Sequence, residues 1–93
     1  MSLLLKDPAA VLDYAIDWGQ QYLDGDFLAE SSWSVEPMED GGVAVLATSF
    51  DERASRVKLS GGSAGQLYRV RNRVVTAAGR EDSRSLVLRV EAR

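Results

Sequence analysis

The chain contains neither cysteine nor histidine. The absence of cysteine excludes a disulfide framework and thiol chemistry, and it fits a reducing cytosol without requiring one. The absence of histidine removes the commonest general base and the commonest metal ligand. Together the two absences exclude the usual zinc sites and any Cys–His or Ser–His nucleophile. We therefore expect no enzyme activity, no cofactor, no metal and no small-molecule substrate.

The sequence also lacks a long apolar run. A membrane-spanning helix needs about 20 consecutive apolar residues, so we expect no membrane association. The run Leu3–Leu5 is too short for a signal peptide and follows no basic region. A length of 93 residues predicts a single domain over residues 1–93, with residues 1–7 as a possible N-terminal arm.

The net charge of −3 hides a strong segregation along the chain. Residues 1–52 carry eleven acids and one base, a charge of −10, whereas residues 53–93 carry ten bases and three acids, a charge of +7. Facing acidic and basic strands would neutralise this split within one sandwich. A bipolar surface that attracts a second copy or a partner is the alternative. The acidic total, with no aromatic residue within Arg69–Arg73, argues against nucleic acid.

Apolar and polar residues alternate in several short segments that are separated by glycine-rich turns. This pattern, with a period of two, predicts strands. The sequence therefore predicts an all-β fold, a small immunoglobulin-like antiparallel β-sandwich of about six to seven strands. The segments lie within residues 12–18, 27–35, 43–47, 57–59, 67–76 and 86–91.

Residues 8–18 allow two interpretations. Asp7 and Pro8 could begin a helix, and Val11, Ala15 and Trp18 fall at helical spacing. The apolar residues of Leu12–Trp18 also alternate with polar or small ones, and a lone helix has no obvious place on so small a sandwich. We therefore predict a strand over Leu12–Trp18, followed by at most one helical turn at Gln20–Leu23.

Gly65 and Tyr68 are the strongest indication of the fold. A glycine turn followed three residues later by a tyrosine at the start of a strand is typical of the tyrosine corner, in which the buried tyrosine hydroxyl binds nearby backbone. Trp18 and Trp33 share the parity of apolar neighbours, so we expect them in the core, although exposed tryptophans could instead line a sugar-binding face.

Four segments could carry a binding function. Asp24–Asp26 with Glu30 offers oxygen ligands for calcium, but Asp-Gly is above all a turn signal. The loop Ser60–Gly65 could bind an anion, or it is a simple connection. Arg69, Arg71 and Arg73 share one strand face, which is either a docking surface or a solvated face neutralised by Asp13, Asp17 or Glu30. Leu3, Leu4 and Leu5 either cover a sheet edge or pack on another subunit.

Eight segments follow one another along nearly the whole chain: Lys6–Pro8, Val11–Trp18, Leu23–Asp26, Ser32–Val35, Val57–Gly65, Tyr68–Asn72, Thr76–Arg80 and the closing strand Ser85–Arg93. In this order they resemble the small phage fibre–tail adaptor proteins. Two sequence features depart from that pattern, namely the acidic turn Glu36–Asp40 and the many arginines of the last strands.

The resemblance implies a structural component of a phage or prophage tail. Such a protein would assemble with copies of itself or with neighbouring tail proteins. It would reside in the virion tail, and in the host cytoplasm before assembly. The family has no catalytic residues to transfer to this chain. The alternative is an immunoglobulin-like module that binds carbohydrate or another cell-surface ligand.

Overall fold

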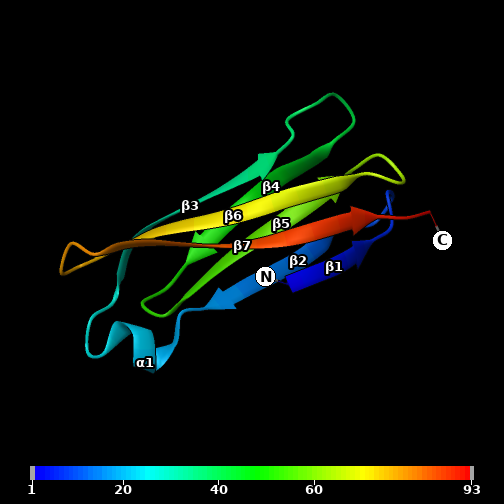
Figure 1. The fold of residues 1–93 in the computed structure, drawn as a ribbon. Coiled ribbons are helices and arrows are strands. Elements are labelled where there is room, and N and C mark those ends of the chain that lie inside the picture. The colour runs from blue at the N-terminus through cyan, green and yellow to red at the C-terminus, as the bar shows by residue number, and fades with distance from the viewer. Residues whose placement is uncertain (1, 93) are drawn as a thin grey trace.

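Two β-sheets pack face to face in the part of the chain that the structure, a computed structural model, describes, residues 2–92 (Figure 1). Sheet A has the strand order β1-β7-β6-β3, and sheet B has the order β2-β5-β4. The prediction of an all-β sandwich is confirmed. The elements are β1 (Ser2–Lys6), β2 (Leu12–Asp17), α1 (Gly19–Leu23), β3 (Leu28–Glu36), β4 (Val43–Phe50), β5 (Ala54–Gly61), β6 (Leu67–Thr76) and β7 (Glu81–Val90).

One strand pairing departs from the expected antiparallel arrangement. β1 runs parallel to β7, with Leu3 opposite Val87 and Leu5 opposite Arg89. The segment considered as an N-terminal arm is therefore, over Ser2–Lys6, an edge strand of sheet A. This pairing is favourable because β1 supplies hydrogen-bond partners to backbone groups of β7 that would otherwise be unpaired.

The ambiguous segment before residue 19 is a strand. Leu12, Tyr14 and Ile16 face the inside of sheet B and are partly buried, whereas Asp13, Ala15 and Asp17 are exposed. The period-two alternation of the sequence therefore matches the observed burial. Val11, which the helical interpretation would have placed on the buried face, is exposed. Residues 19–23 form the short helix α1, which includes the predicted turn at Gln20–Leu23.

The core between the sheets has two apolar clusters. The larger is built on the inward residues of β5, β6 and β7, with Leu59, Val70 and Leu88 completely buried, and the half-buried Leu4 of β1 packs against it. The smaller joins Trp18 and Leu23 to Leu28 and Val74, so α1 closes one end of the sandwich. α1 is too short to cross a membrane, and no other helix is present among residues 2–92.

The connection between β5 and β6 crosses from sheet B to sheet A and depends on glycine. Gly62 has a φ of 112°, and a Cβ there would lie 2.6 Å from a methyl of Val90. Gly65 has a φ of 84°, and its amide donates to the carbonyl of Val90 at 2.7 Å. Such backbone is readily adopted only by glycine, so these positions let the chain turn tightly against the end of β7.

Candidate interaction surfaces

Strand register brings the arginines of β6 and two of the N-terminal leucines onto one exposed surface. Leu3 lies opposite Val87, which lies opposite Arg69, and Leu5 lies opposite Arg89, which lies opposite Leu67. We call this surface the outer face of sheet A. Leu3, Leu5 and Leu67 are exposed by 62%, 47% and 55%, so it combines an apolar end with a basic row. It comprises Leu3, Leu5, Leu67, Arg69, Arg71, Arg73 and Arg89.

Leu4 is the exception among the three leucines, because it points inward and packs against the larger core cluster. The sequence prediction treated Leu3, Leu4 and Leu5 as one group, whereas the strand places Leu4 on the opposite face from the other two. Leu67 was not singled out in the sequence, although its parity with Arg69 and Arg71 was a signal that it shares their face.

The arginines of the outer face are not neutralised by the acids that the sequence suggested. Asp13 and Asp17 belong to β2, in the other sheet. Glu30 lies on β3 of the same sheet but forms no ion pair with these arginines within residues 2–92. Arg73 forms an ion pair with Glu81, and the guanidinium of Arg71 donates to the Ser83 hydroxyl at 3.2 Å. Both partners lie on β7, the strand next to β6, and face the same side of sheet A. These contacts are exposed to solvent, where ion pairs contribute about 0–1 kcal/mol.

The charge segregation along the chain is partly neutralised by contacts between the two halves. Three of the five ion pairs among residues 2–92 join an acid before residue 53 to a later base. These pairs are Asp51–Arg56 at 2.8 Å, Asp13–Lys58 at 3.9 Å and Asp26–Arg80 at 3.3 Å.

Both tryptophans are tied to a buried polar network rather than presented on a surface. The indole N–H of Trp18 donates to the Asn72 side-chain oxygen at 3.0 Å, and that of Trp33 donates to the Ser55 hydroxyl at 2.8 Å. Asn72 and Ser55 are completely buried, and the Asn72 amide group also donates to the Ser31 hydroxyl. The network links the two sheets, because Asn72 lies on β6 and Ser55 on β5.

Tyr68 occupies the end of the core below the crossing loop. Its side chain is 1% exposed, and its hydroxyl accepts a hydrogen bond from the backbone N–H of Ser63 at 2.9 Å. The same hydroxyl donates to the Glu39 carboxylate at 2.8 Å. The tyrosine thus connects the β5–β6 loop to the β3–β4 loop. Its bond to loop backbone has the form of a tyrosine corner.

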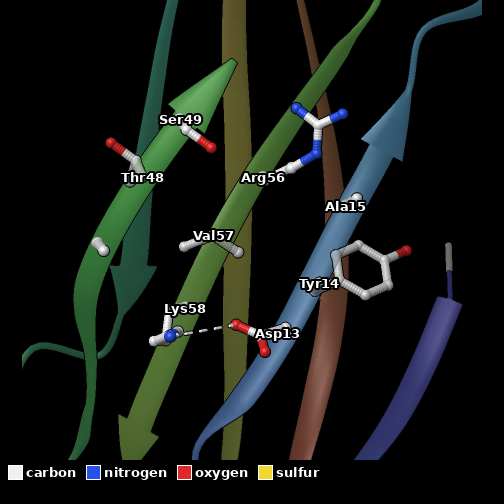
Figure 2. Close-up of a pocket in the computed structure, with 9 residues that line it drawn as sticks. Asp13, Tyr14, Ala15, Thr48, Ser49, Arg56, Val57 and Lys58 are labelled. Atoms are coloured by element: carbon white, nitrogen blue, oxygen red, sulfur yellow. Dashed lines mark ion pairs between the residues drawn. The ribbon is translucent and has the colours of Figure 1, made fainter. Parts of the chain in front are cut away.

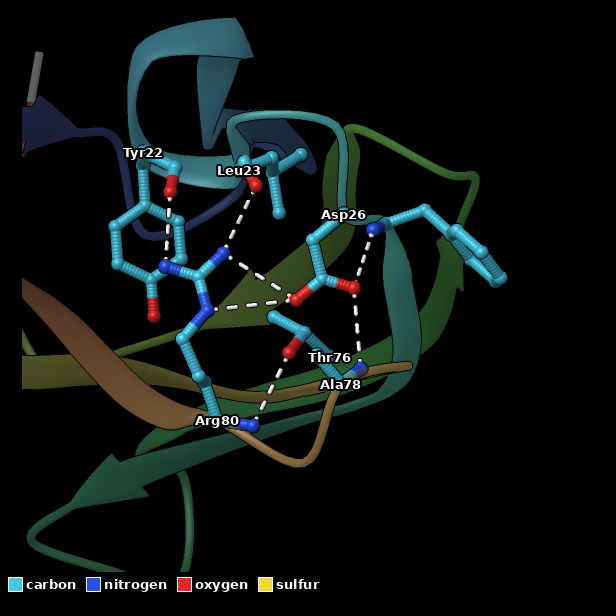
Figure 3. Close-up of polar contacts among 7 residues, drawn as sticks. Tyr22, Leu23, Asp26, Thr76, Ala78 and Arg80 are labelled. Carbon is cyan, nitrogen blue, oxygen red and sulfur yellow. Dashed lines mark hydrogen bonds and ion pairs between the residues drawn. The ribbon is translucent and has the colours of Figure 1, made fainter.

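Asp26 and Arg80 hold α1 against the β6–β7 turn (Figure 3). The Arg80 guanidinium donates to the backbone carbonyls of Tyr22 and Leu23, at the C-terminal end of the helix, and to the Asp26 carboxylate. It also lies 4.8 Å from the centre of the Tyr22 ring. A cation at a helix C-terminus is favourable because the free carbonyls there carry partial negative charge.

The candidate calcium ligands are not gathered at one point. Hydrogen bonds from the Thr76 hydroxyl, the amides of Phe27 and Ala78 and the Arg80 side chain lower the pKa of Asp26 and occupy its oxygens. No group of three or more acidic side chains suited to a metal is present within residues 2–92.

A hollow of about 360 Å³ lies on the outer face of sheet B (Figure 2). It follows β5 between β2 and β4, where the neighbouring strands carry small side chains. Nothing in the sequence pattern indicated it, because its two walls are more than thirty residues apart in the chain. Its lining residues are Asp13, Tyr14, Ala15, Ala47, Thr48, Ser49, Arg56, Val57 and Lys58.

Comparison with models of protein families shows which family this chain belongs to. The model of the Gp77 family, described as podophage GP4 fiber-tail adaptor protein gp77, matches residues 6–89. The chain belongs to the Gp77 family. A search of curated proteins found no match. Membership in a family of phage fiber-tail adaptors supports a structural role in the phage tail and contacts with other tail proteins.

The Gp77 match spans all the elements described above except most of β1 and the last residue of β7. It begins at Lys6, which is buried and whose ammonium group donates to the Gly61 carbonyl at 2.6 Å. Burial lowers the pKa of this lysine, while the neighbouring Asp7 acts in the opposite direction. The first matched residue is thus the one that fastens β1 to the far end of β5.

Proposed function

We propose that this protein is a non-enzymatic tail adaptor that assembles with copies of itself or with neighbouring tail proteins through the outer face of sheet A. The observation that carries the proposal is that Leu3 and Leu5 share one exposed sheet face with Arg69, Arg71 and Arg73, from which β7 separates them. The protein would fold in the host cytoplasm and act in the virion tail.

Apolar and basic groups on the same face suit a protein partner. Removing Leu3, Leu5 and Leu67 from water would contribute to affinity, since burial of a leucine is worth about 1.5–3 kcal/mol. The arginines supply directed hydrogen bonds to carboxylates, which favour one orientation of the partner. Arginine is also enriched among residues that dominate interface energies.

The alternative is an immunoglobulin-like module that binds a carbohydrate or another cell-surface ligand. Such a module usually presents an exposed aromatic platform. The N–H groups of Trp18 and Trp33 are bound inside the sandwich, which leaves neither ring free to turn outward. The Tyr68 contact supports an immunoglobulin-like arrangement of the fold, but it favours neither function.

The test is light scattering at increasing protein concentration with the double variant Leu3→Ser and Leu5→Ser. Both side chains are exposed, so the strand and the half-buried Leu4 are retained. This variant is sharper than deletion of residues 1–5, which would remove Leu4 from the core. A matched control is Val11→Ser, whose side chain is 55% exposed on a different part of the chain. We expect weaker association for the double variant and none of this effect for the control.

The contribution of charge is measured with the double variant Arg69→Gln and Arg71→Gln and with salt. Screening shortens the Debye length from about 10 Å at 0.1 M to about 3 Å at 1 M salt. Salt should therefore weaken association of the wild type and have less effect on the arginine variant. A protein that stays monomeric at every concentration and in both salts would exclude self-assembly. Equal association of the leucine variant and the Val11 control would exclude this face.

A further inference from the structure

The hollow on sheet B has a floor of small side chains. Ala15 on β2 and Ala47 and Ser49 on β4 flank β5, and they leave open space above its backbone. The register of β4 shifts between Val45 and Ala47, which places Ala47 opposite Lys58 on the outer face. A cavity of about 150 Å³ is enough for benzene, so a hollow of about 360 Å³ has room for a long apolar side chain.

Two bases project from β5, the strand beneath the hollow. Arg56 and Lys58 both line it and are half exposed (Figure 2). The Arg56 guanidinium is held by the Asp51 carboxylate at 2.8 Å, so Lys58 is the base that a partner can reach. The Lys58 ammonium lies 3.9 Å from the Asp13 carboxylate, which is a long and exposed contact. Because exposed pairs of this kind contribute little, Lys58 can exchange Asp13 for a better placed acid.

A complementary feature protrudes at one end of the same molecule. Met38, in the β3–β4 loop, is 91% exposed, the highest value among the exposed large apolar side chains of residues 3–92. The loop projects beyond the ends of its strands (Figure 1). Glu36, Glu39 and Asp40 flank Met38, and none of the three forms an ion pair within residues 2–92. The Tyr68 hydroxyl holds Glu39, which fixes the base of this acidic loop.

We propose that Met38 of one copy inserts into the sheet B hollow of a second copy, with the acids beside Met38 meeting Lys58. Methionine suits an open, irregular hollow because it is long, flexible and polarizable. The acids beside Met38 are opposite in charge to Lys58, so they favour this orientation and oppose the reverse one. The inference rests on the proposed self-assembly and adds a second surface to it.

The contact would join two different surfaces of the same chain. A contact of this kind is heterologous, so each copy keeps one free loop and one free hollow. Successive copies then form a closed ring if the rotation between them allows, and an open filament otherwise. Apart from Glu36, which lies opposite Arg69 at one end of the sheet, the outer face of sheet A stays available to other partners in such an assembly.

Cysteine cross-linking tests the contact, because the natural chain has no cysteine. A tagged Met38→Cys protein is mixed with untagged Ala47→Cys or Ala15→Cys protein and oxidised at high concentration. The matched control replaces these acceptors with Val11→Cys, an exposed position outside the hollow. Seating would bring the thiols together at high effective concentration, so heterodimer should exceed the control by about tenfold or more. Adding Glu36→Gln and Asp40→Asn to the Met38→Cys protein should lower that excess.

The outcomes separate this contact from the broader proposal. Equal cross-linking to the hollow and to Val11→Cys overturns the Met38 contact. If light scattering still detects association in that case, self-assembly through the outer face of sheet A stands. If the hollow binds small apolar molecules or another tail protein but gives no excess of heterodimer, the proposal that a second copy occupies it is also overturned.

Discussion

The indole N–H of Trp18 donates to the side-chain oxygen of Asn72 across the core at 3.0 Å. Asn72 completes its bonding through its amide group, which donates to the Ser31 hydroxyl and the Ser32 carbonyl. Every buried side-chain nitrogen and oxygen has a partner within residues 2–92. A satisfied network of this kind specifies one packing arrangement, because any slip of a strand leaves buried polar groups unpaired.

Replacing Asn72 with leucine should therefore destabilise the protein strongly. The change leaves the Trp18 N–H and the hydroxyl groups of Ser31 and Ser55 without one partner each, at about 1–3 kcal/mol for an unpaired buried group. We expect a loss of about 2–4 kcal/mol in urea unfolding. Arg71→Gln, on the exposed side of the same strand, is the control and should change stability by less than about 0.5 kcal/mol. Equal effects of the two changes would contradict a structural role for the network.

Tyr68 allows the ring and the hydroxyl to be separated. Tyr68→Ala should cost about 3–5 kcal/mol because it empties a large buried site. Tyr68→Phe keeps the ring and removes the bonds to Ser63 and Glu39, for an expected loss of about 1–2 kcal/mol. Glu39→Gln retains an acceptor and should cost less than Tyr68→Phe. Denaturant titration of the three variants measures the difference, and a Tyr68→Phe protein as stable as the wild type would exclude the hydroxyl contacts.

The Asp26 contacts predict a loss of stability in acid. Hydrogen bonds lower its folded-state pKa below the ordinary value of 3.8, so in the intervening pH range the unfolded chain binds more protons. The stabilising contribution is present above pH 3.8 and is lost as the pH falls through the lower folded-state pKa. Asp26→Asn should give a shallower decline of stability below about pH 4 than the wild type. Parallel curves for the two proteins in thermal melts would contradict this linkage.

Calcium should have no effect on stability. The Asp26 oxygens already accept hydrogen bonds from backbone amides and Arg80, and Glu30 lies on an exposed strand face. Melting curves recorded with calcium and with a chelator should superimpose. A ligand that binds only the folded state raises the melting temperature, so a clear rise with calcium would favour the alternative of a ligand-binding module.

The sequence by itself determined most of the strands and, where the alternation is unbroken, the side of the strand that is buried. In β6, Tyr68, Val70 and Val74 alternate with Arg69 and Arg71, and this period of two follows from strand geometry alone. The loop at Gly65 could also be predicted from the sequence, because a backbone position with positive φ is usually occupied by glycine. Local spacing in the chain is enough for such predictions.

Only the tertiary structure decided which strands lie side by side. The parallel pairing of β1 with β7 joins residues more than eighty positions apart, and it alone places Leu3 near Arg69 while turning Leu4 inward. The hollow over β5 and the reach of Arg80 to α1 arise in the same way. The alternation of apolar and polar residues predicts that a side chain faces outward, but the neighbouring side chain that it contacts depends on the strand order and register. Those are set by the packing of the whole sandwich, which no local pattern contains.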